Sequence, residues 1–572
     1  MRTKKAHEGN AVTLRTWVIL VAAIAAFVCG AFAEEASDGV FRLNLLPGEC
    51  WWGGLTIEGR RQPISDAEDY SVDMRVMHGR GDSGCNPAAP LLVSSKGRWV
   101  WCEQSFKIEQ KGGTLTITPE KDAPVLSGTA GSTLRDASLY CSARFFPPQG
   151  TPDLDFFRSP ILNTWIEFNY GQSQSNTLAY AKSFISNGVP PGVFMIDCTW
   201  QRGFGDWNFD GGRFPDPKGM VKEMNGMGYR MMLWMCPKIS TDGPNFWHLK
   251  NKGYLLKGKG FWGVAESKWW PGKSAILDCT NPKAFDWLNG ELHRLMADYG
   301  VEGFFFDAGD ADDFPDDGRP FEKGATKSEQ VRAFHLIGTK VPLQQHRASW
   351  KAGGYPIMVT LNDKHPTYSD LRACIRDMAN AGIIGYPFVV ADLVGGGRLS
   401  GLNGMVRIEP LFYGATDACT GYRLTDEKRE WLRDFFIRSL QVQTLSPMVQ
   451  FSMSPWRALD SRRQEMVRAL VALRQKWAPY ITQCAVDAGR TGEPMLRLME
   501  YAFPGHGYER VNDQFLMGER LLVAPVVEDG VTSRKVVIPP GKWKADDGSV
   551  TEGPTTIEVS TPLERLPYFI KL

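Results

Sequence analysis

The pattern of hydrophobic and polar residues divides the chain into three parts. From about residue 35 to 150, short runs such as GRWVWCEQSFKIEQ and GTLTITPE alternate apolar and polar positions, and Gly, Pro and Asp-Ser turns separate them. This alternation is typical of antiparallel strands with one buried face. From about residue 484 to the end, RKVVIPPGKWKADDG and TTIEVS return to the same pattern. The sequence therefore predicts a β-domain at each end of the chain.

Between these two parts, apolar runs alternate with helical patterns. The runs ILNTWIEFNYG, GVFMIDCTW, YRMMLWMCP, GFFFDAGD, YPIMVTLND and IIGYPFVVAD each end on polar or aromatic residues. Repeated strand–helix units predict a parallel sheet, and a stretch of roughly 300 residues predicts a (β/α)8 TIM barrel. The predicted fold class is thus a barrel over 155–483, flanked by an N-terminal β-sandwich over 34–154 and a C-terminal β-domain over 484–572.

One strand–helix unit can be predicted in detail. Asn281 can cap a helix, Pro282 suits its first position and Gly300 can end it. The apolar residues between them fall on one helix face, namely Phe285, Leu288, Leu292, Leu295 and Tyr299. The apolar run GFFF follows directly, which predicts a buried strand that ends at an aspartate.

Four aspartates stand at the ends of predicted strands: Asp197, Asp307, Asp363 and Asp392. In (β/α)8 barrels the active site is built at the C-terminal ends of the strands. One such acid could be a cap or a salt-bridge partner. Four around one barrel mouth predict a catalytic or binding site.

The strand end at Asp307 opens a loop with further acids. We expect Asp310, Asp312 and Asp313 to be solvated loop and turn residues. A calcium site is the alternative, because the loop is rich in carboxylate oxygens, but the glycine and the distal glutamate of an EF-type loop are missing.

Composition and charge exclude several function classes. The 572 residues are 43% hydrophobic and carry a formal net charge of +1, without a block of like charges, so a nucleic-acid partner is not expected. The chain has no His-Glu-x-x-His, Cys-x-x-Cys or Walker motif, so no metal and no cofactor are expected. The 19 Trp residues suit sugar-binding clefts, although core packing is the alternative for most of them.

The N-terminus has the composition of an export signal. Basic residues precede the apolar run WVILVAAIAAFVCGAFA, and AFA before Glu34 fits a small-x-small cleavage site. A membrane anchor is the alternative, although the run is short for a bilayer span. We therefore predict a signal peptide over residues 1–33 with cleavage near Ala33, a periplasmic or secreted protein, and no stable membrane insertion after the signal is removed.

Several motifs resemble a known family. FFFDAGD, PFVVADLVGGG and NDQFLMGERLLVAPVVEDGVTSRKVVIPPGKW resemble glycoside hydrolase family 31, as do WPGKSAILDCTNP and PLERLPYFIKL. The resemblance runs from about residue 40 to the end of the chain. It implies a retaining α-glycosidase with a (β/α)8 barrel between β-domains. DWNFDGGRFPDP and PMVQFSMSPW resemble the branch with α-galactosidase-like members.

The resemblance implies roles for two carboxylates. Asp307 takes the place of the nucleophile, which follows the apolar strand in this family. Asp363 matches the general acid/base by its position eight residues before LRA, although TLND replaces the family's Trp-x-Gly-Asp. Asp392, at the next strand end, is the alternative proton donor.

The resemblance also implies substrate contacts by Asp197, Trp270, Arg347 and Asp392. Arg347 lies sixteen residues before Asp363, where the family has a substrate-binding arginine. A salt bridge to a strand-end acid is the alternative for Arg347, and packing at the barrel rim is the alternative for Trp270. Asp392 matches the aspartate of the family's Gly-Ala-Asp-Ile-Gly-Gly motif and can be structural instead.

These observations predict an exported, retaining exo-α-glycosidase whose partner is a small carbohydrate with a terminal α-linked hexose. The resemblance implies a histidine in α-glucosidases after a late strand, and QFSMSPWRA has none, so an α-galactoside is favoured. An α-glucosidase or another α-hexosidase is the alternative. A catalytically silent carbohydrate-binding relative is the alternative from another class.

Overall fold

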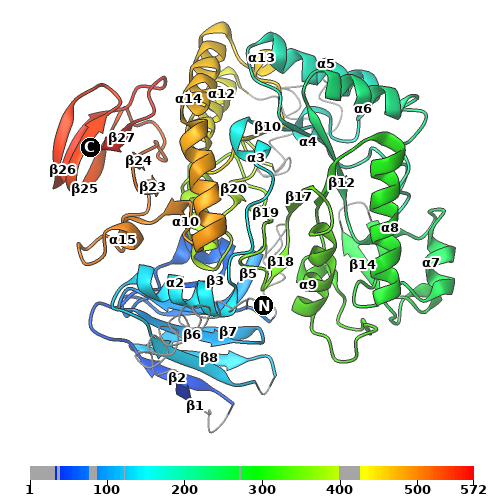
Figure 1. The fold of residues 1–572 in the computed structure, drawn as a ribbon, viewed down its shortest axis with the longest axis horizontal. Helices are drawn as coiled ribbons and strands as arrows, with labels where there is room; N and C mark the ends of the chain where they lie inside the picture. The colour runs from blue at the N-terminus through cyan, green and yellow to red at the C-terminus, as the bar shows by residue number, and fades with distance from the viewer. Residues whose placement is uncertain (1–31, 35–38, 76–86, 122, 270–271, 398–424) are drawn as a thin grey trace, which may run out of the picture.

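The computed structural model describes residues 32–34, 39–75, 87–121, 123–269, 272–397 and 425–572. Along the chain, a barrel follows an N-terminal β-domain and precedes a C-terminal one, as the sequence predicts (Figure 1). No helix within the described ranges is long and apolar enough to cross a bilayer. Most of the predicted signal peptide, residues 1–31, and Trp270 lie outside the described residues.

Eight parallel strands form a nearly closed barrel, in the order β20-β19-β17-β16-β12-β11-β10-β21. Near the two outer strands, the backbone N–H of Val394 donates to the carbonyl of Gln450 at 2.8 Å. The strands are β10 (Ile161–Asn163), β11 (Val193–Ile196), β12 (Arg230–Met235), β16 (Gly303–Phe306), β17 (Leu343–His346), β19 (Met358–Thr360), β20 (Val389–Val390) and β21 (Gln450–Phe451).

Helices follow most of these strands, and the helix predicted in detail is confirmed. The Asn281 side chain caps α8 by accepting from the Lys283 N–H at 3.1 Å, and Gly300 ends the helix with φ 80°. Leu288, Leu292 and Leu295 are fully buried. The main helices are α5 (Gln174–Ser186), α6 (Pro217–Gly226), α8 (Pro282–Tyr299), α9 (Lys327–Gly338), α10 (Tyr368–Ile383), α12 (Asp426–Thr444) and α14 (Ser461–Thr491).

A small antiparallel sheet is inserted between β12 and α8. It has the order β13-β15-β14, with β13 (Lys238–Ser240), β14 (Glu266–Trp269) and β15 (Gly272–Ile276). Its Lys238 ammonium lies 4.2 Å from the centre of the Trp269 ring and pairs with Asp313. The insertion therefore contacts the acidic loop after β16.

Residues 347–357, between β17 and β19, contain a short strand instead of a helix. This strand, β18 (Ser349–Trp350), pairs in parallel with Pro87 and Ala88 at the start of β5. The segment that leaves the barrel at Arg347 is therefore part of the N-terminal sheet.

The N-terminal domain is a sandwich of two sheets, as predicted. One sheet has the order β1-β9-β6-β5-β18, with β3 also pairing β5, and the other has the order β2-β8-β7-β4. Trp51, Leu92, Val100 and Ile117 lie in the core between the sheets. The strands are β1 (Phe32–Glu34), β2 (Phe41–Asn44), β3 (Trp51–Leu55), β4 (Tyr70–Asp73), β5 (Pro87–Ser94), β6 (Arg98–Cys102), β7 (Phe106–Lys111), β8 (Thr114–Pro119) and β9 (Val125–Thr129).

The C-terminal domain is one antiparallel sheet beside α14 (Figure 1), in the order β22-β23-β24-β27-β25-β26. The boundary that the sequence suggested near residue 484 falls within α14, and the first strand of the domain begins at Leu496. The strands are β22 (Leu496–Arg497), β23 (Phe515–Met517), β24 (Leu521–Val523), β25 (Ser533–Ala545), β26 (Val550–Ser560) and β27 (Tyr568–Lys571).

The N-terminal domain packs on the barrel at several places, two of which involve the helices α10 and α9. At the first, the short helix η1 (Thr56–Arg61) lies against α10, and Asn380 donates to the Leu55 carbonyl at 2.8 Å. A Cβ on Gly59 would lie only 2.5 Å from the Arg376 carbonyl oxygen, so the two backbones touch there.

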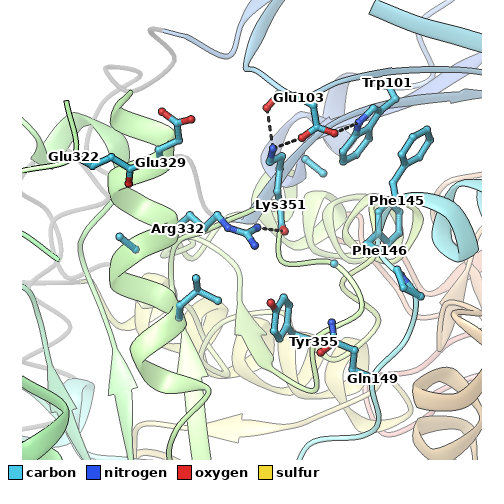
Figure 2. A pocket seen from close by; sticks show the side chains of 15 residues that line it. Trp101, Glu103, Phe145, Phe146, Gln149, Glu322, Glu329, Arg332, Lys351 and Tyr355 are labelled. Carbon is cyan, nitrogen blue, oxygen red and sulfur yellow. Dashed lines mark hydrogen bonds and ion pairs between the residues drawn. The ribbon is translucent and has the colours of Figure 1, made fainter. Parts of the chain in front are cut away.

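The second place is beside α9, where a cavity of about 560 Å³ remains (Figure 2). The Lys351 ammonium crosses to the N-terminal domain and pairs with Glu103 at 2.6 Å. Arg332 of α9 donates to the Lys351 carbonyl at 2.7 Å, and the Trp101 indole donates to Glu103 at 2.9 Å. These contacts hold the segment after β18 between the two domains.

Candidate active site

The strand ends converge on one pocket at the C-terminal mouth of the barrel. All four predicted strand-end acids line it. The lining includes Asn163, Trp165, Asp197, Trp234, Asp307, Gln345, Arg347, Thr360, Asp363, Asp392 and Gln450. The larger cavity beside α9 contains none of these acids, so the chemistry belongs to the barrel mouth.

Arg347 joins the two carboxylates predicted to be catalytic. Its Nε donates to Asp307 Oδ1 at 2.9 Å, and its Nη2 lies 2.7 Å from Asp363 Oδ1. Its Nη1 donates to the Leu361 carbonyl at 2.6 Å. Nε and Nη2 share one edge of the guanidinium, so the two carboxylates face the same side of one planar group.

The neighbouring carboxylates stabilise the positive charge of Arg347. Burial alone would lower the pKa of the guanidinium, but the charges of Asp363, Asp307 and Asp392 raise it well above its ordinary value. The salt bridge that the sequence left as an alternative is therefore present. Contact between Arg347 and a substrate stays a prediction, and the guanidinium still has two N–H groups beyond these three bonds.

Asp307 has a second donor that sequence analysis missed. The indole N–H of Trp234 donates to Asp307 Oδ2 at 2.8 Å, so both oxygens of this carboxylate accept from fixed donors. Trp234 comes from β12, whose residues pair with β16 in register. Trp234 could have been selected from the sequence, because it lies near the end of YRMMLWMCP, a run predicted to be a strand.

Asp197 is held at the end of β11, deeper in the pocket. Its Oδ2 accepts from the Asn163 amide at 2.6 Å, and its Oδ1 accepts from the Cys198 N–H at 2.7 Å. Burial and then the negative charge of Asp307 raise the pKa of Asp197 to about 7. Asn163, which sequence analysis did not select, stands at the end of β10 and orients this acid.

Asp392 has a constrained backbone, with φ 106°. Its Oδ2 accepts from the N–H groups of Lys364 and Gly397, each at 2.8 Å. Burial and then the charge of Asp363 raise the pKa of Asp392 to about 7. Left-handed φ in a non-glycine residue is unfavourable and persists where surrounding contacts fix it, often at functional sites.

Asp363 is the more open of the two predicted catalytic acids. Its side chain is 33% exposed, against 23% for Asp307. An acid/base must reach the leaving group and then water, whereas a nucleophile must reach the anomeric carbon inside the pocket. The exposures suit the predicted division of roles.

Two of the acids that follow Asp307 are less solvated than the sequence suggested, whereas Asp312 is exposed as expected. Asp310 is only 7% exposed, and Asp313 pairs with Lys238 and accepts from the Gly309 N–H at 2.7 Å. Within the described part of the chain, no group of three or more His, Cys, Asp or Glu side chains has the arrangement of a metal site.

A (β/α)8 barrel with paired carboxylates at its mouth is typical of the barrel glycoside hydrolases. A model described as the glycosyl hydrolases family 31 TIM-barrel domain matches residues 162–484, and one described as the family's C-terminal domain matches residues 492–572. The first match alone covers more than half of the 572 residues. The chain belongs to glycosyl hydrolase family 31, which confirms the resemblance.

Curated relatives fit this assignment. The myogenesis-regulating glycosidase of Mus musculus is 27% identical over 485 residues, which cover 82% of this chain and 65% of the relative. Alpha-glucosidase 2 of Bacillus thermoamyloliquefaciens is 25% identical over 450 residues, with coverages of 72% and 53%. The chain thus spans between 53% and 65% of the length of these two relatives.

Solved structures share the fold. The structure of a GH31 alpha-xylosidase from a soil metagenome, complexed with xylose, matches with a TM-score of 0.77 at 20% sequence identity. The match covers 95% of this chain and 81% of the xylosidase chain. A GH31 dextranase of Flavobacterium johnsoniae, complexed with glucose, has a TM-score of 0.78 at 20% identity, with coverages of 95% and 68%. The likeness extends from the N-terminal sandwich to the C-terminal sheet.

Proposed function

We propose that this protein is a retaining α-glycosidase that removes a terminal α-linked hexose, with α-galactosides preferred. The observation that carries the proposal is the Arg347 bridge, which holds Asp307 and Asp363 on one edge of a guanidinium. Retaining glycosidases need their two carboxyl groups about 5 Å apart, so that attack is direct and no water fits between them.

The geometry supports a division of labour. Asp307, held by Trp234 and Arg347, attacks the anomeric carbon and forms a covalent glycosyl-enzyme. Asp363 protonates the leaving oxygen, and as a carboxylate it then takes a proton from the water that hydrolyses the intermediate. Asp197 and Asp392, whose oxygens face the same pocket, accept hydrogen bonds from sugar hydroxyls.

Two features of the site support a preference for galactose over glucose. The segment after β21, FSMSPW, has no histidine, whereas the family's α-glucosidases have one at a corresponding position. Instead, the Ser452 hydroxyl donates to Asn163 Oδ1 at 2.8 Å, and Asn163 donates to Asp197. A different set of polar groups therefore surrounds the sugar, and a site built for one epimer rejects the other because buried polar groups lose their partners.

A panel of aryl α-glycosides tests the sugar. We expect kcat/KM to be higher for nitrophenyl α-galactoside than for the glucoside and the xyloside. A glucoside preference above about tenfold, or turnover of xylosides alone, would contradict the galactoside proposal. Binding of sugars without turnover of any glycoside in the panel would instead favour the silent carbohydrate-binding protein.

Azide rescue tests the two carboxylates. In Asp307→Ala, azide can enter only the space vacated by the nucleophile and yields a β-glycosyl azide. In Asp363→Ala, dinitrophenyl substrates still form the intermediate, and azide attacks it from the α face without needing a base. Product stereochemistry by NMR distinguishes these cases. An α product from Asp392→Ala, with Asp363→Ala unaffected by azide, would transfer the proton donor to Asp392.

Export remains part of the proposal and rests on the N-terminal sequence pattern alone. We infer that residues 1–33 direct export and are removed near Ala33. Expression in a bacterium, fractionation and N-terminal mass spectrometry of the mature protein test this. A mature chain that still begins at Met1 and stays with the membrane fraction would favour an uncleaved anchor.

A further inference from the structure

The loop that carries Asp363 is tied to the barrel by its two neighbours in the sequence. The Lys364 ammonium donates to the Asn362 side-chain oxygen at 2.7 Å, which links the residues on either side of Asp363. The backbone N–H of Lys364 donates to Asp392 at 2.8 Å. The Lys364 side chain is only 4% exposed, so this lysine points into the protein and not toward solvent.

The ammonium of Lys364 is neutralised by Asp377 of α10. Its Nζ lies 2.7 Å from Asp377 Oδ2, and the Asp377 side chain is fully buried. A lysine and an aspartate in a protein interior carry a large desolvation cost, and apolar side chains of similar size often replace such a pair without loss of stability. The stability of the barrel therefore gives no reason for an ion pair at this place.

A residue of the N-terminal domain completes the network. Arg60, in η1, donates from Nη2 to Asp377 Oδ2 and from its backbone N–H to Asp377 Oδ1, each at 3.1 Å. A second contact joins Arg60 Nη1 to Asp370 at 3.4 Å, and Asp370 accepts from the His365 N–H at 2.7 Å. The N-terminal domain thus reaches the Lys364 side chain through Asp377 and the His365 backbone through Asp370.

We propose that Asp377 and Lys364 are positioning residues for the general acid/base Asp363, and that Arg60 brings the N-terminal domain into this role. Asp377 fixes the direction of Lys364, and Lys364 fixes Asn362 and its own backbone, so that Asp363 keeps its place opposite Asp307. The inference rests on the proposed function of Asp363. A displacement of about 1 Å at a reacting group can cost on the order of 100-fold in rate.

A positioning role for the proton donor has a kinetic signature that a structural role lacks. Substrates with a poor leaving group need protonation by Asp363, whereas dinitrophenyl substrates need very little. Loss of the network should therefore slow glycosylation with an alkyl α-glycoside far more than with a dinitrophenyl α-glycoside. General destabilisation would reduce both rates in proportion to the amount of folded enzyme.

The test compares kcat/KM for these two substrates in Asp377→Asn, Lys364→Met and the double variant Lys364→Met/Asp377→Leu. Glu58→Gln is a matched control, because Glu58 is a buried acid of η1, the helix that carries Arg60, and pairs with Arg61 at 2.9 Å. We expect the ratio of dinitrophenyl to alkyl kcat/KM to rise about tenfold or more in the three loop variants. Glu58→Gln should keep the wild-type ratio.

The double variant keeps the proposal falsifiable if the single variants fold poorly. It removes both charges and fills the space with apolar side chains, so its melting temperature should recover while the altered ratio persists. A wild-type ratio in a well-folded double variant would overturn the proposal. Equal losses on both substrates would do the same.

Hydrogen–deuterium exchange separates this proposal from the proposed function. Residues 362–366 should lose protection in Asp377→Asn and keep it in Glu58→Gln. If the wild-type protein hydrolyses no glycoside in the panel, the proposed function fails, while this measurement still tests the positioning. Unchanged protection of 362–366 in Asp377→Asn would overturn the positioning role whatever the activity.

Discussion

Replacing Asp197 with Asn should change how stability depends on pH. Burial and the neighbouring charge of Asp307 raise the pKa of Asp197 from 3.8 to about 7 in the folded protein. The folded protein therefore keeps a proton that the unfolded chain releases between about pH 4 and pH 7, and stability falls as the pH rises through this window. Above pH 7 the full cost is present. Below pH 4 it disappears.

The size of the effect follows from the shift. At 1.36 kcal/mol per pKa unit, the raised pKa of Asp197 destabilises the folded protein by about 4 kcal/mol at pH 8 and by about 2 kcal/mol at pH 5. The amide that replaces the carboxyl group in Asp197→Asn carries no charge and loses about 1 kcal/mol of hydrogen bonding at both pH values. For 572 residues unfolding together, with an entropy of about 2.1 cal/mol/K per residue, 1 kcal/mol corresponds to roughly 1 °C in Tm.

Calorimetry of wild type and Asp197→Asn at pH 5 and pH 8 tests this reasoning. The Tm of the variant relative to wild type should rise by about 2 °C between the two pH values. In an Asp307→Asn background the rise should shrink, because Asp307 is the second cause of the shift. Asp242→Asn, at an exposed position, is the control for the substitution itself. The same Tm difference at both pH values would refute an elevated pKa for Asp197.

Three further predictions concern the site and the barrel. Arg347→Lys keeps the positive charge, but a lysine cannot bond to both carboxylates at once. The lost charge-assisted hydrogen bond, of about 1.5–3 kcal/mol, should lower kcat/KM for dinitrophenyl galactoside at least tenfold. An unchanged kcat/KM would contradict a functional bridge by Arg347. Trp234→Phe removes the 2.8 Å donor to Asp307 and should slow the glycosylation step about tenfold in pre-steady-state assays, whereas an unaltered step would remove Trp234 from the site. Gly303→Ala would place a Cβ 1.7 Å from the Leu343 carbonyl oxygen and should sharply lower the yield of folded protein. The control Gly290→Ala adds a Cβ to open space beside α8 and should keep or raise Tm. Equal yields of the two variants would contradict the close approach of β16 and β17.

The barrel could be predicted where its strands are apolar and its helices carry caps. α8 is bounded as predicted, because Asn281, Pro282 and Gly300 act locally. β17 and β21 were not among the predicted runs, since LQQH and QF carry polar residues. The Gln345 amide donates to Gln450 Oε1 inside the barrel at 3.1 Å, and only the closed sheet brings these two side chains together.

The same distinction holds for the site. Asp197, Asp307, Asp363 and Asp392 could be selected because each directly follows an apolar run, and the structure places them in one pocket. The ion pair of Lys364 with Asp377 could not be predicted, since a lysine in TLNDKH has no local sign of burial and its partner is contributed by a later helix.

Because β18 pairs with β5, the barrel and the N-terminal domain cannot be expressed as separate fragments without breaking a sheet. The chain crosses from the barrel into the N-terminal sheet two residues after Arg347 and returns to form β19. A fragment that starts near residue 155 would leave β18 as an unpaired edge and release the backbone that holds Arg347. The sandwich and the barrel are therefore separate in sequence but inseparable as expression fragments, and neither can be exchanged alone between relatives without rebuilding this shared strand.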